Sequence, residues 1–417
     1  MKDSIYDWII VGGGVSGICL AEILSRQGKS VHLLEKNKEL ASETSKDFHE
    51  WVHSGALYTL VPDNLLTLRY LLGATDDIFE YYSCFDRMNL SPSEKGIKIN
   101  REGWFNNDNI EFKYRSHKWN PIWLAMVSRS INIIDLISKH DWLRRRAGSE
   151  YGRSKVKMIH NFTDIPKQLL NKDKFYKITS TDFTMNSRIL LSDILNSSIV
   201  NGAEISTGCE VDHIKEFDKF TEVSFEGTTL RCKKVVITSP DAISKFLDIP
   251  IKEGYAPMAI VDNVPENEKS FVELDYFVNR CINLLKKTNG IGQAGGITLS
   301  NQDKIQNYLD YVIREHKKRN PSIRLLDTYV GIKKELVQKG ENRNYLYHIN
   351  QPRENIWSVV LGKFTLAFSM APEFYRRVYN SNPSKDPKLR PDKSNNKLIA
   401  DTAWKEISTR ENHYGNH

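Results

Sequence analysis

The first 36 residues contain the feature that most constrains the fold of this chain. An apolar segment at residues 5–11 precedes the glycine-rich turn at residues 12–17, and a helical pattern follows that turn. A second apolar segment at residues 30–34 ends at Glu35. This order of strand, GxGxxG turn, helix, strand and acid is typical of a parallel β-sheet that binds a dinucleotide.

Each part of this motif has a physical task in such a site. Gly12 permits the tight turn, Gly14 lets the backbone approach a pyrophosphate, and Gly17 allows the helix to pack closely on the strand. The helix start offers free N–H groups to the phosphates, and Glu35 is spaced to accept hydrogen bonds from ribose hydroxyls. The residues predicted to hold the dinucleotide here are Gly12, Gly14, Val15, Ser16, Gly17, Glu35 and Lys36.

The composition is that of a globular chain long enough for two domains. The chain has 417 residues, of which 40% are hydrophobic, and no apolar run is long enough to suggest a membrane span. Residues 1–4 run directly into the first expected strand, so no signal peptide is expected. Five scattered cysteines lack any CxxC spacing, which favours reduced thiols in a cytoplasmic protein and predicts no metal site.

The formal net charge of +7 is compatible with an anionic substrate or an acidic membrane surface. A nucleic-acid role has little support, because basic and aromatic residues are not interleaved in one patch. Residues 122–142 have an amphipathic helical pattern that leads into Arg144–Arg146, a combination suited to peripheral membrane contact. A helix packed on its own protein with a solvated basic end is the commoner case. We expect a cytoplasmic protein, with peripheral membrane contact as the alternative.

Strands and helices are expected along the rest of the chain as well. Residues 187–200 and 301–318 have helical patterns, and residues 202–238 suggest a small meander that ends in a buried strand. Residues 290–296 spell GxGxxG, but no long apolar strand precedes them, so we reject them as a second nucleotide site. An apolar strand at residues 356–363 runs into a further helix start that could face a cofactor.

Three separated segments together indicate a family. The segment at residues 7–35 is followed by residues 43–57, which contain Glu-Thr-Ser and Val-His-Ser-Gly-Ala-Leu, and by residues 358–366, which read Ser-Val-Val-Leu-Gly-Lys-Phe-Thr-Leu. In this order they resemble FAD-dependent oxidoreductases of the D-amino acid oxidase / glycerol-3-phosphate dehydrogenase superfamily. In the glycerol-3-phosphate dehydrogenase branch the later two segments look like Ser-x-Lys-Leu-Ile-His-Gly-Gly-Leu and Val-Thr-Gly-Gly-Lys-Leu-Thr. The substrate half of the chain shows no close match.

This resemblance implies that the dinucleotide is FAD. Its adenosine would lie on Glu35 and its pyrophosphate on the first glycine-rich turn, while the isoalloxazine would lie near residues 51–55 and 361–365. Val211 would lie on the adenine side. The further residues implied in FAD binding are Ser54, Gly55, Val211, Gly362, Lys363, Phe364 and Thr365.

Two positions depart from the pattern of these relatives. Lys333 stands where relatives carry the arginine of a Gly-x-Arg segment that holds an anionic substrate group, and a lysine lacks the bidentate fork of arginine. Ser239-Pro240 replaces an Ala-Gly pair that often lies beside the FAD.

The resemblance and the pattern together predict an α/β fold, with a Rossmann-like FAD-binding domain and a mixed-sheet substrate domain. Because the segments of the first domain are separated in the chain, that domain is expected to be discontinuous. The expected division is residues 1–84, 181–248 and 326–380 for the FAD-binding domain, 85–180 and 249–325 for the substrate or cap domain, and 381–417 for a polar tail that is mobile or wraps the surface.

The predicted reaction is hydride transfer from a C–OH or C–N bond of a small polar substrate to flavin N5. The candidate catalytic residues are His53 and His348 as bases, with Lys333 and Arg353 as partners of an anionic group. The electron acceptor stays open between oxygen, a quinone and a protein. The alternatives are a nicotinamide-dependent dehydrogenase and a non-catalytic flavin-binding or assembly module.

Overall fold

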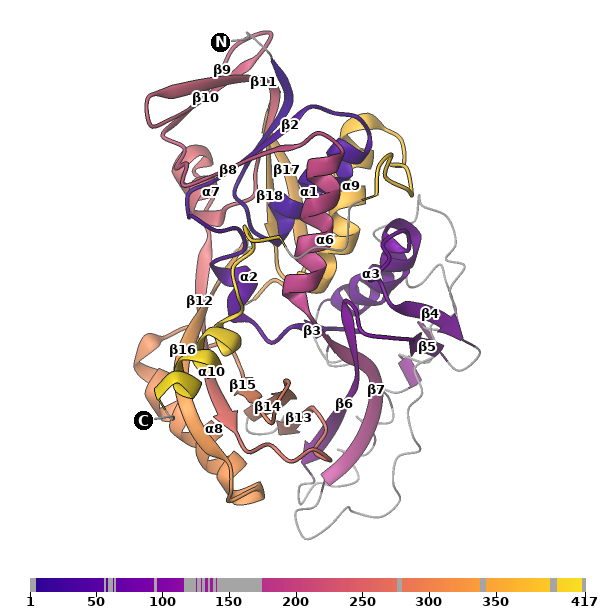
Figure 1. Ribbon diagram of the computed structural model, residues 1–417, viewed down its shortest axis with the longest axis vertical. Helices are drawn as coiled ribbons and strands as arrows, with labels where there is room; N and C mark the ends of the chain where they lie inside the picture. The colour runs from indigo at the N-terminus through magenta and orange to yellow at the C-terminus, as the bar shows by residue number, and fades with distance from the viewer. Residues whose placement is uncertain are drawn as a thin grey trace.

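The computed structural model describes most of the chain. The described residues are 5–55, 58, 63, 65–93, 96–115, 125, 129, 132–133, 136–137, 140, 175–275, 280–337, 343–390 and 396–414. Two large β-sheets with helices packed against them form the body of the molecule, one toward each end of its long axis (Figure 1).

The first sheet has a parallel core built from the N-terminal motif. β1 pairs in parallel with both β2 and β11, while β2 pairs in parallel with β8 and β11 with β18. Strands of a parallel sheet are typically covered on both faces and apolar. In agreement with this, Trp8, Ile9 and Ile10 of β1 are fully buried. The order of the strands is β17 (Tyr347–Arg353), β18 (Ile356–Leu361), β11 (Thr228–Ile237), β1 (Tyr6–Val11), β2 (Val31–Glu35) and β8 (Glu204–Thr207).

Helices cover one face of this sheet and a small meander covers the other. Trp8 and Ile10 pack in the cluster that contains α1, α3, α6 and α9, whereas Ile9 and Val11 pack toward α7 and the meander. This division follows from the alternation of side chains along a strand. The elements are α1 (Val15–Arg26), α3 (Leu66–Tyr82), α6 (Ser187–Val200), α9 (Ala367–Tyr379), α7 (Pro240–Leu247), β9 (His213–Glu216) and β10 (Thr221–Phe225).

The second sheet is mixed and carries α8 (Ile305–Arg319) on one face. Ala259, Phe271 and Leu284 of three of its strands pack against Leu309 and Val312 of that helix. Its strand order is β16 (Arg324–Glu335), β12 (Lys252–Asp262), β15 (Gly292–Gly296), β14 (Arg280–Lys286), β13 (Phe271–Asp275), β6 (Phe105–Arg115), β7 (Phe175–Met185) and β3 (Trp51–Val52). The smaller elements are α2 (Thr44–Asp47), β4 (Leu90–Ser93), β5 (Gly96–Ile99), η4 (Gln302–Lys304), η5 (Phe364–Leu366) and α10 (Ala403–Tyr414).

These elements confirm the predicted α/β fold. The glycine-rich segment at residues 290–296, which the sequence suggests is a turn, instead contains the sheet strand β15. β15 lies between β12 and β14 in antiparallel pairing. β16 runs across the expected domain boundary at residue 326 and pairs with β12 along its whole length. The expected polar tail contains α10, and its residues Ile399 and Ala400 are buried, so it wraps back onto the body.

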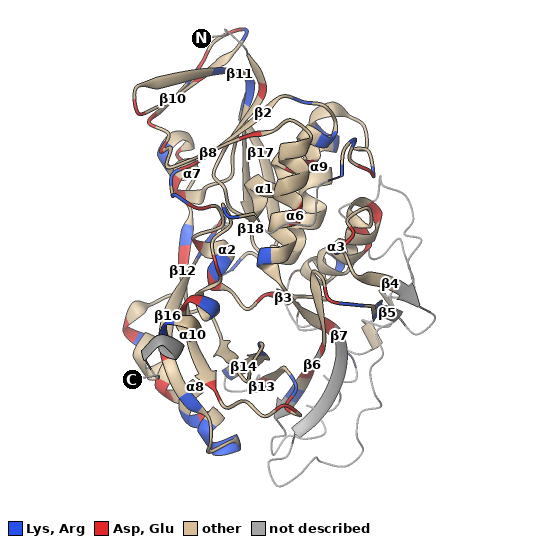
Figure 2. Ribbon diagram, in the orientation of Figure 1, with Lys and Arg blue, Asp and Glu red and all other residues tan. Residues whose placement is uncertain are grey.

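Charged residues of both signs are spread over the described elements (Figure 2). The last turn of α8 has a basic run, Lys317 to Arg319, where the helix dipole favours positive charge. The amphipathic helix expected at residues 122–142 lies mostly outside the described residues, and the run Arg144–Arg146 that follows it lies wholly outside them. Among the described helices, none is both long and apolar enough to cross a membrane.

Candidate active site

A large cavity of about 590 Å³ lies between the two sheets. At one end it is lined by the first glycine-rich turn, Glu35 and Val211. At the other end, which we call the inner end, it is lined by His53, Lys333 and residues 361–364. The predicted dinucleotide motif and the later segments therefore line one continuous space, although more than 300 residues separate them in the chain.

The glycine-rich turn has the close backbone packing that its sequence predicts. Gly12 has a φ of +113°, and a Cβ there would lie 2.7 Å from the backbone nitrogen of Ser239. A Cβ on Gly17 would collide with the Gly12 carbonyl oxygen. Gly12 and Gly17 therefore have no room for a side chain. A Cβ on Gly14 would meet only the Ser45 hydroxyl oxygen, at 3.3 Å.

Glu35 is anchored at the end of β2, as the motif requires. One of its carboxylate oxygens accepts the Gly13 N–H at 2.6 Å and the other accepts the Asn37 N–H at 2.8 Å. Each oxygen retains a further lone pair, so the carboxylate can still accept hydroxyl hydrogens from a ribose. The neighbouring Lys36 also lines the cavity and pairs with Glu43 at 2.8 Å and Asp241 at 3.5 Å.

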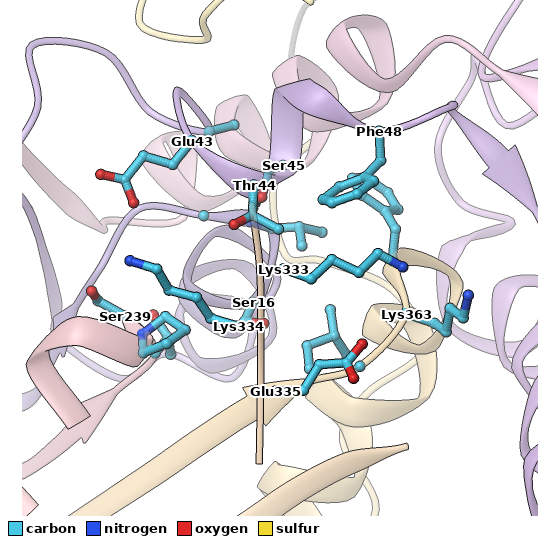
Figure 3. Close-up of a pocket in the computed structure, with 18 of the residues that line it drawn as sticks. Ser16, Glu43, Thr44, Ser45, Phe48, Ser239, Lys333, Lys334, Glu335 and Lys363 are labelled. Carbon is cyan, nitrogen blue, oxygen red and sulfur yellow. Dashed lines mark hydrogen bonds between the residues drawn. The ribbon is translucent and has the colours of Figure 1, made fainter. Parts of the chain in front are cut away.

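Hydroxyl groups surround the start of α1, where a pyrophosphate is expected. Ser16 and Ser42 line the cavity, and the Ser42 hydroxyl is buried without a hydrogen-bond partner among the described residues. The Ser45 hydroxyl accepts the Val15 N–H at 3.0 Å, and Figure 3 shows Thr44 and Ser45 next to each other. A glycine cradle, a helix N-terminus and an unpaired hydroxyl fit the phosphates of FAD.

The loop that carries His53 is fixed from two directions. The backbone N–H of His53 donates to the Thr365 hydroxyl at 3.1 Å. The imidazole ring of His53 stacks on Trp51, with 4.1 Å between the ring centroids. The Trp51 indole N–H donates to Asp182 at 2.9 Å, and the Ser54 N–H donates to the same carboxylate at 3.0 Å. This loop is therefore held rigidly against both sheets at the inner end of the cavity.

Three of the predicted FAD residues support this loop from behind and are not among the residues that line the cavity. Ser54 also contacts Asp182 through its hydroxyl, and Thr365 is fully buried. Gly55 has a φ of +93°, and a Cβ there would lie 2.8 Å from Leu68. In contrast, Val211, Gly362, Lys363 and Phe364 line the cavity directly.

The environment of His53 keeps its ring neutral. Burial lowers its pKa well below the ordinary value, and the charges of Lys363 and Lys333 lower it further. The ring nitrogen Nδ1 is buried and has no hydrogen-bond partner among the described residues. The ring can therefore accept a proton at Nδ1 if the Nε2 tautomer is present.

A group of cations lies beside this loop. Lys333 and Lys363 line the cavity with Glu335 and Arg343, and Figure 3 shows Lys333, Glu335 and Lys363 directed into the same space. Arg343 donates to both oxygens of Glu335, at 2.6 and 2.9 Å. The one carboxylate in this group is thus already paired with Arg343, and among the described residues no other carboxylate pairs with Lys333 or Lys363.

Burial and mutual repulsion make both lysines weaker bases. Burial and the charge of Arg343 lower the Lys333 pKa to about 8. Burial, Lys333 and Arg343 lower the Lys363 pKa well below its ordinary value. The Lys363 ammonium lies 5.2 Å from the Tyr58 ring centroid and 5.0 Å from that of Tyr345, so aromatic faces stabilise its charge.

Two of the four predicted catalytic residues lie elsewhere. His348 is in β17 opposite Val360, and it is not among the residues that line the cavity. Arg353 is exposed at the end of that strand and donates to the Phe246 carbonyl at 3.4 Å. Only His53 and Lys333 of the predicted set meet at one place.

Sequence reasoning missed several residues that line the inner end of the cavity. Arg343 and Glu335 form an ion pair, His49 precedes the fixed loop, and Asn283 comes from β14. None of them belongs to a local motif. The one available signal was the two-residue spacing of Lys333 and Glu335, which puts both side chains on the same face of a strand.

Solved structures with the same fold come from several flavoenzymes. L-α-glycerophosphate oxidase from Mycoplasma pneumoniae, with FAD bound, has a TM-score of 0.66 at 15% identity and covers 96% of this chain and 100% of its own. NikD, an unusual amino acid oxidase, has a TM-score of 0.62 at 14% identity, covering 93% of this chain and 98% of its own. Glycine oxidase from Bacillus cereus has a TM-score of 0.61 at 13% identity, covering 92% and 99%.

A search of curated proteins gives no match. The model of the FAD-dependent oxidoreductase family (DAO) matches residues 7–280, which is more than half of the chain. This match covers the glycine-rich turn, Glu35 and His53, and it agrees with the fit of the cavity to FAD. The chain is an FAD-dependent oxidoreductase and belongs to the DAO family.

Proposed function

We propose that this enzyme oxidises a C–OH or C–N bond of a small anionic molecule. The observation that carries the proposal is the meeting of a neutral His53 with Lys333 and Lys363 at the inner end of the cavity. When bound, FAD supplies the acceptor for the hydride at its N5 atom. The residues of the chain then have to bind the substrate, orient it and receive its proton.

Lys333 and Lys363 are proposed to bind the anionic group of the substrate. With Arg343 paired to Glu335, Lys333 and Lys363 are the basic side chains left to meet an anion at this end. An anion placed between them offsets their repulsion and raises the pKa of both lysines. Lysine binds such a group as a point charge, so both carboxylate and phosphate suit the site.

His53 is proposed to receive the proton of a substrate hydroxyl or amine at Nδ1. Its stacking on Trp51 and the hydrogen bond of its N–H to Thr365 fix the orientation of the loop. The positive charges of Lys363 and Lys333 disfavour a protonated His53 ring. The ring should therefore release this proton readily to solvent or product. General base catalysis by an oriented histidine typically contributes about 10²–10⁴-fold to a rate.

The similar structures support both kinds of bond. One of them is named as a glycerophosphate oxidase, and others as amino acid, glycine and iminodiacetate oxidases. At identities of 13–15% the first three share the fold, and they bring the bond types to this chain as candidates only. We also propose that the enzyme is cytoplasmic and that its electron acceptor is oxygen, a quinone or a protein.

Anaerobic reduction of the bound flavin tests the proposal. The purified protein is expected to be yellow, to release FAD on denaturation, and to lose its flavin colour with at least one hydroxy acid, phosphorylated polyol or amino acid. Air and a soluble quinone, added separately to the reduced protein, then distinguish an oxidase from a dehydrogenase. A protein that binds FAD but is reduced by no member of the panel would support a non-catalytic flavin-binding module.

A further inference from the structure

The wall of the cavity formed by the second sheet contains a polar side chain among apolar neighbours. On the face of the sheet opposite α8, Ala256, Met258 and Val272 line the cavity, and Asn283 of β14 lies directly across from Val272. Its sequence neighbours Ile282 and Leu284 point the other way, into the cluster beneath α8. The alternation of β14 therefore directs the Asn283 side chain into the cavity.

Asn283 is buried without its full set of hydrogen bonds. The residue is 2% exposed, and its side-chain oxygen has no hydrogen-bond partner among the described residues. Its backbone carbonyl pairs with Nε2 of the buried His316 at 3.2 Å, which fixes the strand from the opposite face. A buried amide oxygen without a partner is unfavourable, so a hydrogen-bond donor inside the cavity would satisfy it.

His49 has a second unpaired atom at the same wall. Its Nε2 is buried without a partner among the described residues and lies against Gly295, where a Cβ would come within 2.9 Å. Burial and the charge of Lys287, followed by Lys333 and Lys363, lower the His49 pKa to about 3 against the opposing effect of the neighbouring Asn283 side chain. The ring is neutral near pH 7, and the positive field around it disfavours any cationic ligand.

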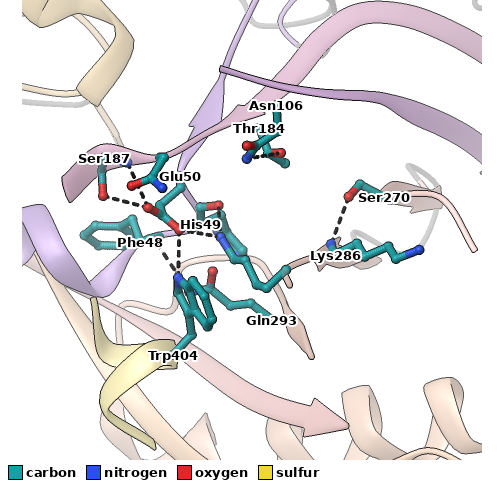
Figure 4. A network of polar contacts seen from close by, with 12 residues as sticks. Phe48, His49, Glu50, Asn106, Thr184, Ser187, Ser270, Lys286, Gln293 and Trp404 are labelled. Carbon is teal, nitrogen blue, oxygen red and sulfur yellow. Dashed lines mark hydrogen bonds and ion pairs between the residues drawn. The ribbon is translucent and has the colours of Figure 1, made fainter. Parts of the chain in front are cut away.

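A buried ion pair holds His49 in this place. Lys287 donates to the His49 carbonyl at 3.0 Å and to Glu50 at 2.8 Å, and Glu50 also accepts hydrogen bonds from Ser187 and Trp404 (Figure 4). The Glu50 contacts come from the residue after β14, from the start of α6 and from α10. The ring of His49 therefore lies on a fixed loop and is not free to find another partner.

We propose that Asn283 and His49 form a subsite for an uncharged polar group of the substrate, a hydroxyl or an amide. This subsite rests on the proposed function and adds to it: Lys333 and Lys363 bind the anionic group, while Asn283 and His49 bind a second group on the same molecule. The substrate class is then a carboxylate or phosphate that carries an additional hydroxyl or amide beyond the oxidised carbon. A second cationic group is excluded by the three lysines around His49.

Matched anions that differ by one hydroxyl test the subsite in the FAD-loaded protein. The pairs are lactate with glycerate, 2-hydroxybutanoate with 2,4-dihydroxybutanoate, and propane-1,2-diol 1-phosphate with glycerol 3-phosphate. Their Kd values are measured from the change of the flavin spectrum under anaerobic conditions. We expect the more hydroxylated member of at least one pair to bind about tenfold more tightly, which is the effect of one good hydrogen bond.

Variants assign that preference to the subsite. Asn283→Leu should abolish the preference and change the Kd of the less hydroxylated member by less than about twofold. Asn283→Asp retains an acceptor of the same shape and should retain the preference, with weaker binding of both anions because it adds a negative charge. Met258→Leu, on the same face, should leave the preference unchanged.

The results separate the subsite from the function on which it rests. Equal binding within every pair, or an unchanged preference in Asn283→Leu, would overturn the subsite and leave the anion site intact. Failure of all six anions to perturb the flavin would overturn both the subsite and the anion site. Loss of FAD from the unmodified protein would contradict the proposed function itself.

Discussion

At the scale of single residues, protonation is set by burial and by neighbouring cations. Lys333, Lys363, His49 and His53 all face the inner end of the cavity, and the pKa of each is lowered. Such shifts are common where a site binds an anion or moves a proton. A lysine at position 333 has a direct consequence, because a lysine can lose its proton in the accessible pH range and an arginine does not.

The affinity of the enzyme for anions should therefore depend on pH. Below a pH of about 8 Lys333 is protonated and attracts the anion, and above this value it becomes neutral. We expect the Kd of a bound carboxylate to rise by up to about tenfold per pH unit above pH 8. Titrations of the FAD-loaded protein from pH 6.5 to pH 9.5, read from the flavin spectrum, measure this change.

Lys333→Gln is the control for this pH dependence. The variant should bind the carboxylate weakly at pH 7 and show a flat profile around pH 8. The free energy of unfolding of the unliganded protein should rise with pH between pH 8 and pH 10.5. The reason is that the lowered pKa of Lys333 in the folded state makes the unfolded state bind more protons in this range. An unliganded protein that loses stability across this window through Lys333 would contradict the assignment.

Substitution of His53 should separate chemistry from cofactor binding. In His53→Gln we expect the rate of flavin reduction by substrate to fall about 10²–10⁴-fold, because the proton acceptor is lost. The FAD content should stay near that of the unmodified protein, because the first glycine-rich turn, which is expected to bind the pyrophosphate, lies at the other end of the cavity. Rapid-mixing measurements under anaerobic conditions give the rate, and a reduction rate within threefold of the unmodified value would exclude His53 as the base.

At the scale of elements, α10 contributes a contact to the wall of the cavity. Trp404 donates its indole N–H to the buried Glu50 at 2.7 Å, and Lys46 pairs with Glu406 at 2.9 Å. Burial alone would raise the Glu50 pKa, but Lys287 and Ser187 outweigh this effect and lower it. Glu50 is therefore charged, and each lost partner leaves a buried carboxylate less well solvated.

Trp404→Phe should weaken the attachment of α10. The loss of a hydrogen bond to a charged group is expected to lower the free energy of unfolding by about 1.5–3 kcal/mol. Urea denaturation of the FAD-loaded protein measures it, and Lys405→Ala on the exposed side of the same helix should change stability by less than about 0.5 kcal/mol. Equal effects of the two substitutions would show that Trp404 has no special role.

The N-terminal elements could be predicted from the sequence because their signals are local. The turn, the helix and the acid of the first motif lie within 36 residues, and the structure has each of them as expected. The inner end of the cavity had no such signal. Lys333 of β16 and Lys363 after β18 belong to different sheets and line the same cavity, and Asn283 faces that cavity because of the position of β14 in its sheet.

His348 shows the opposite difficulty. Its alternation with apolar neighbours correctly indicates a strand, but alternation does not say which face of the strand meets a cofactor. Arg353 is subject to the same ambiguity, and the β-hairpin between β17 and β18 leaves it exposed. The choice between faces depends on the helices that cover the sheet, which is information that a single strand does not contain.

At the scale of the whole molecule, the cavity lies between two sheets, so FAD contacts both when it binds. Binding to the folded state alone should stabilise the protein by about 2.7 kcal/mol at a free FAD concentration of 100 Kd. Thermal unfolding with and without added FAD measures this effect. FMN, which lacks the adenosine half, should stabilise much less, and equal stabilisation by FMN would contradict the role of Glu35 and the glycine-rich turn.

The contribution of α10 to the Glu50 contacts also has a consequence for biosynthesis. The ribosome makes the glycine-rich turn first. Residues 361–364, which line the cavity, and Trp404, which contacts Glu50, are made only after most of the sequence has been translated. A nascent chain can form the adenosine end early, whereas the flavin end has to wait for these late segments. Cofactor capture should therefore be completed after translation, and nascent chains stalled before residue 356 should not retain FAD.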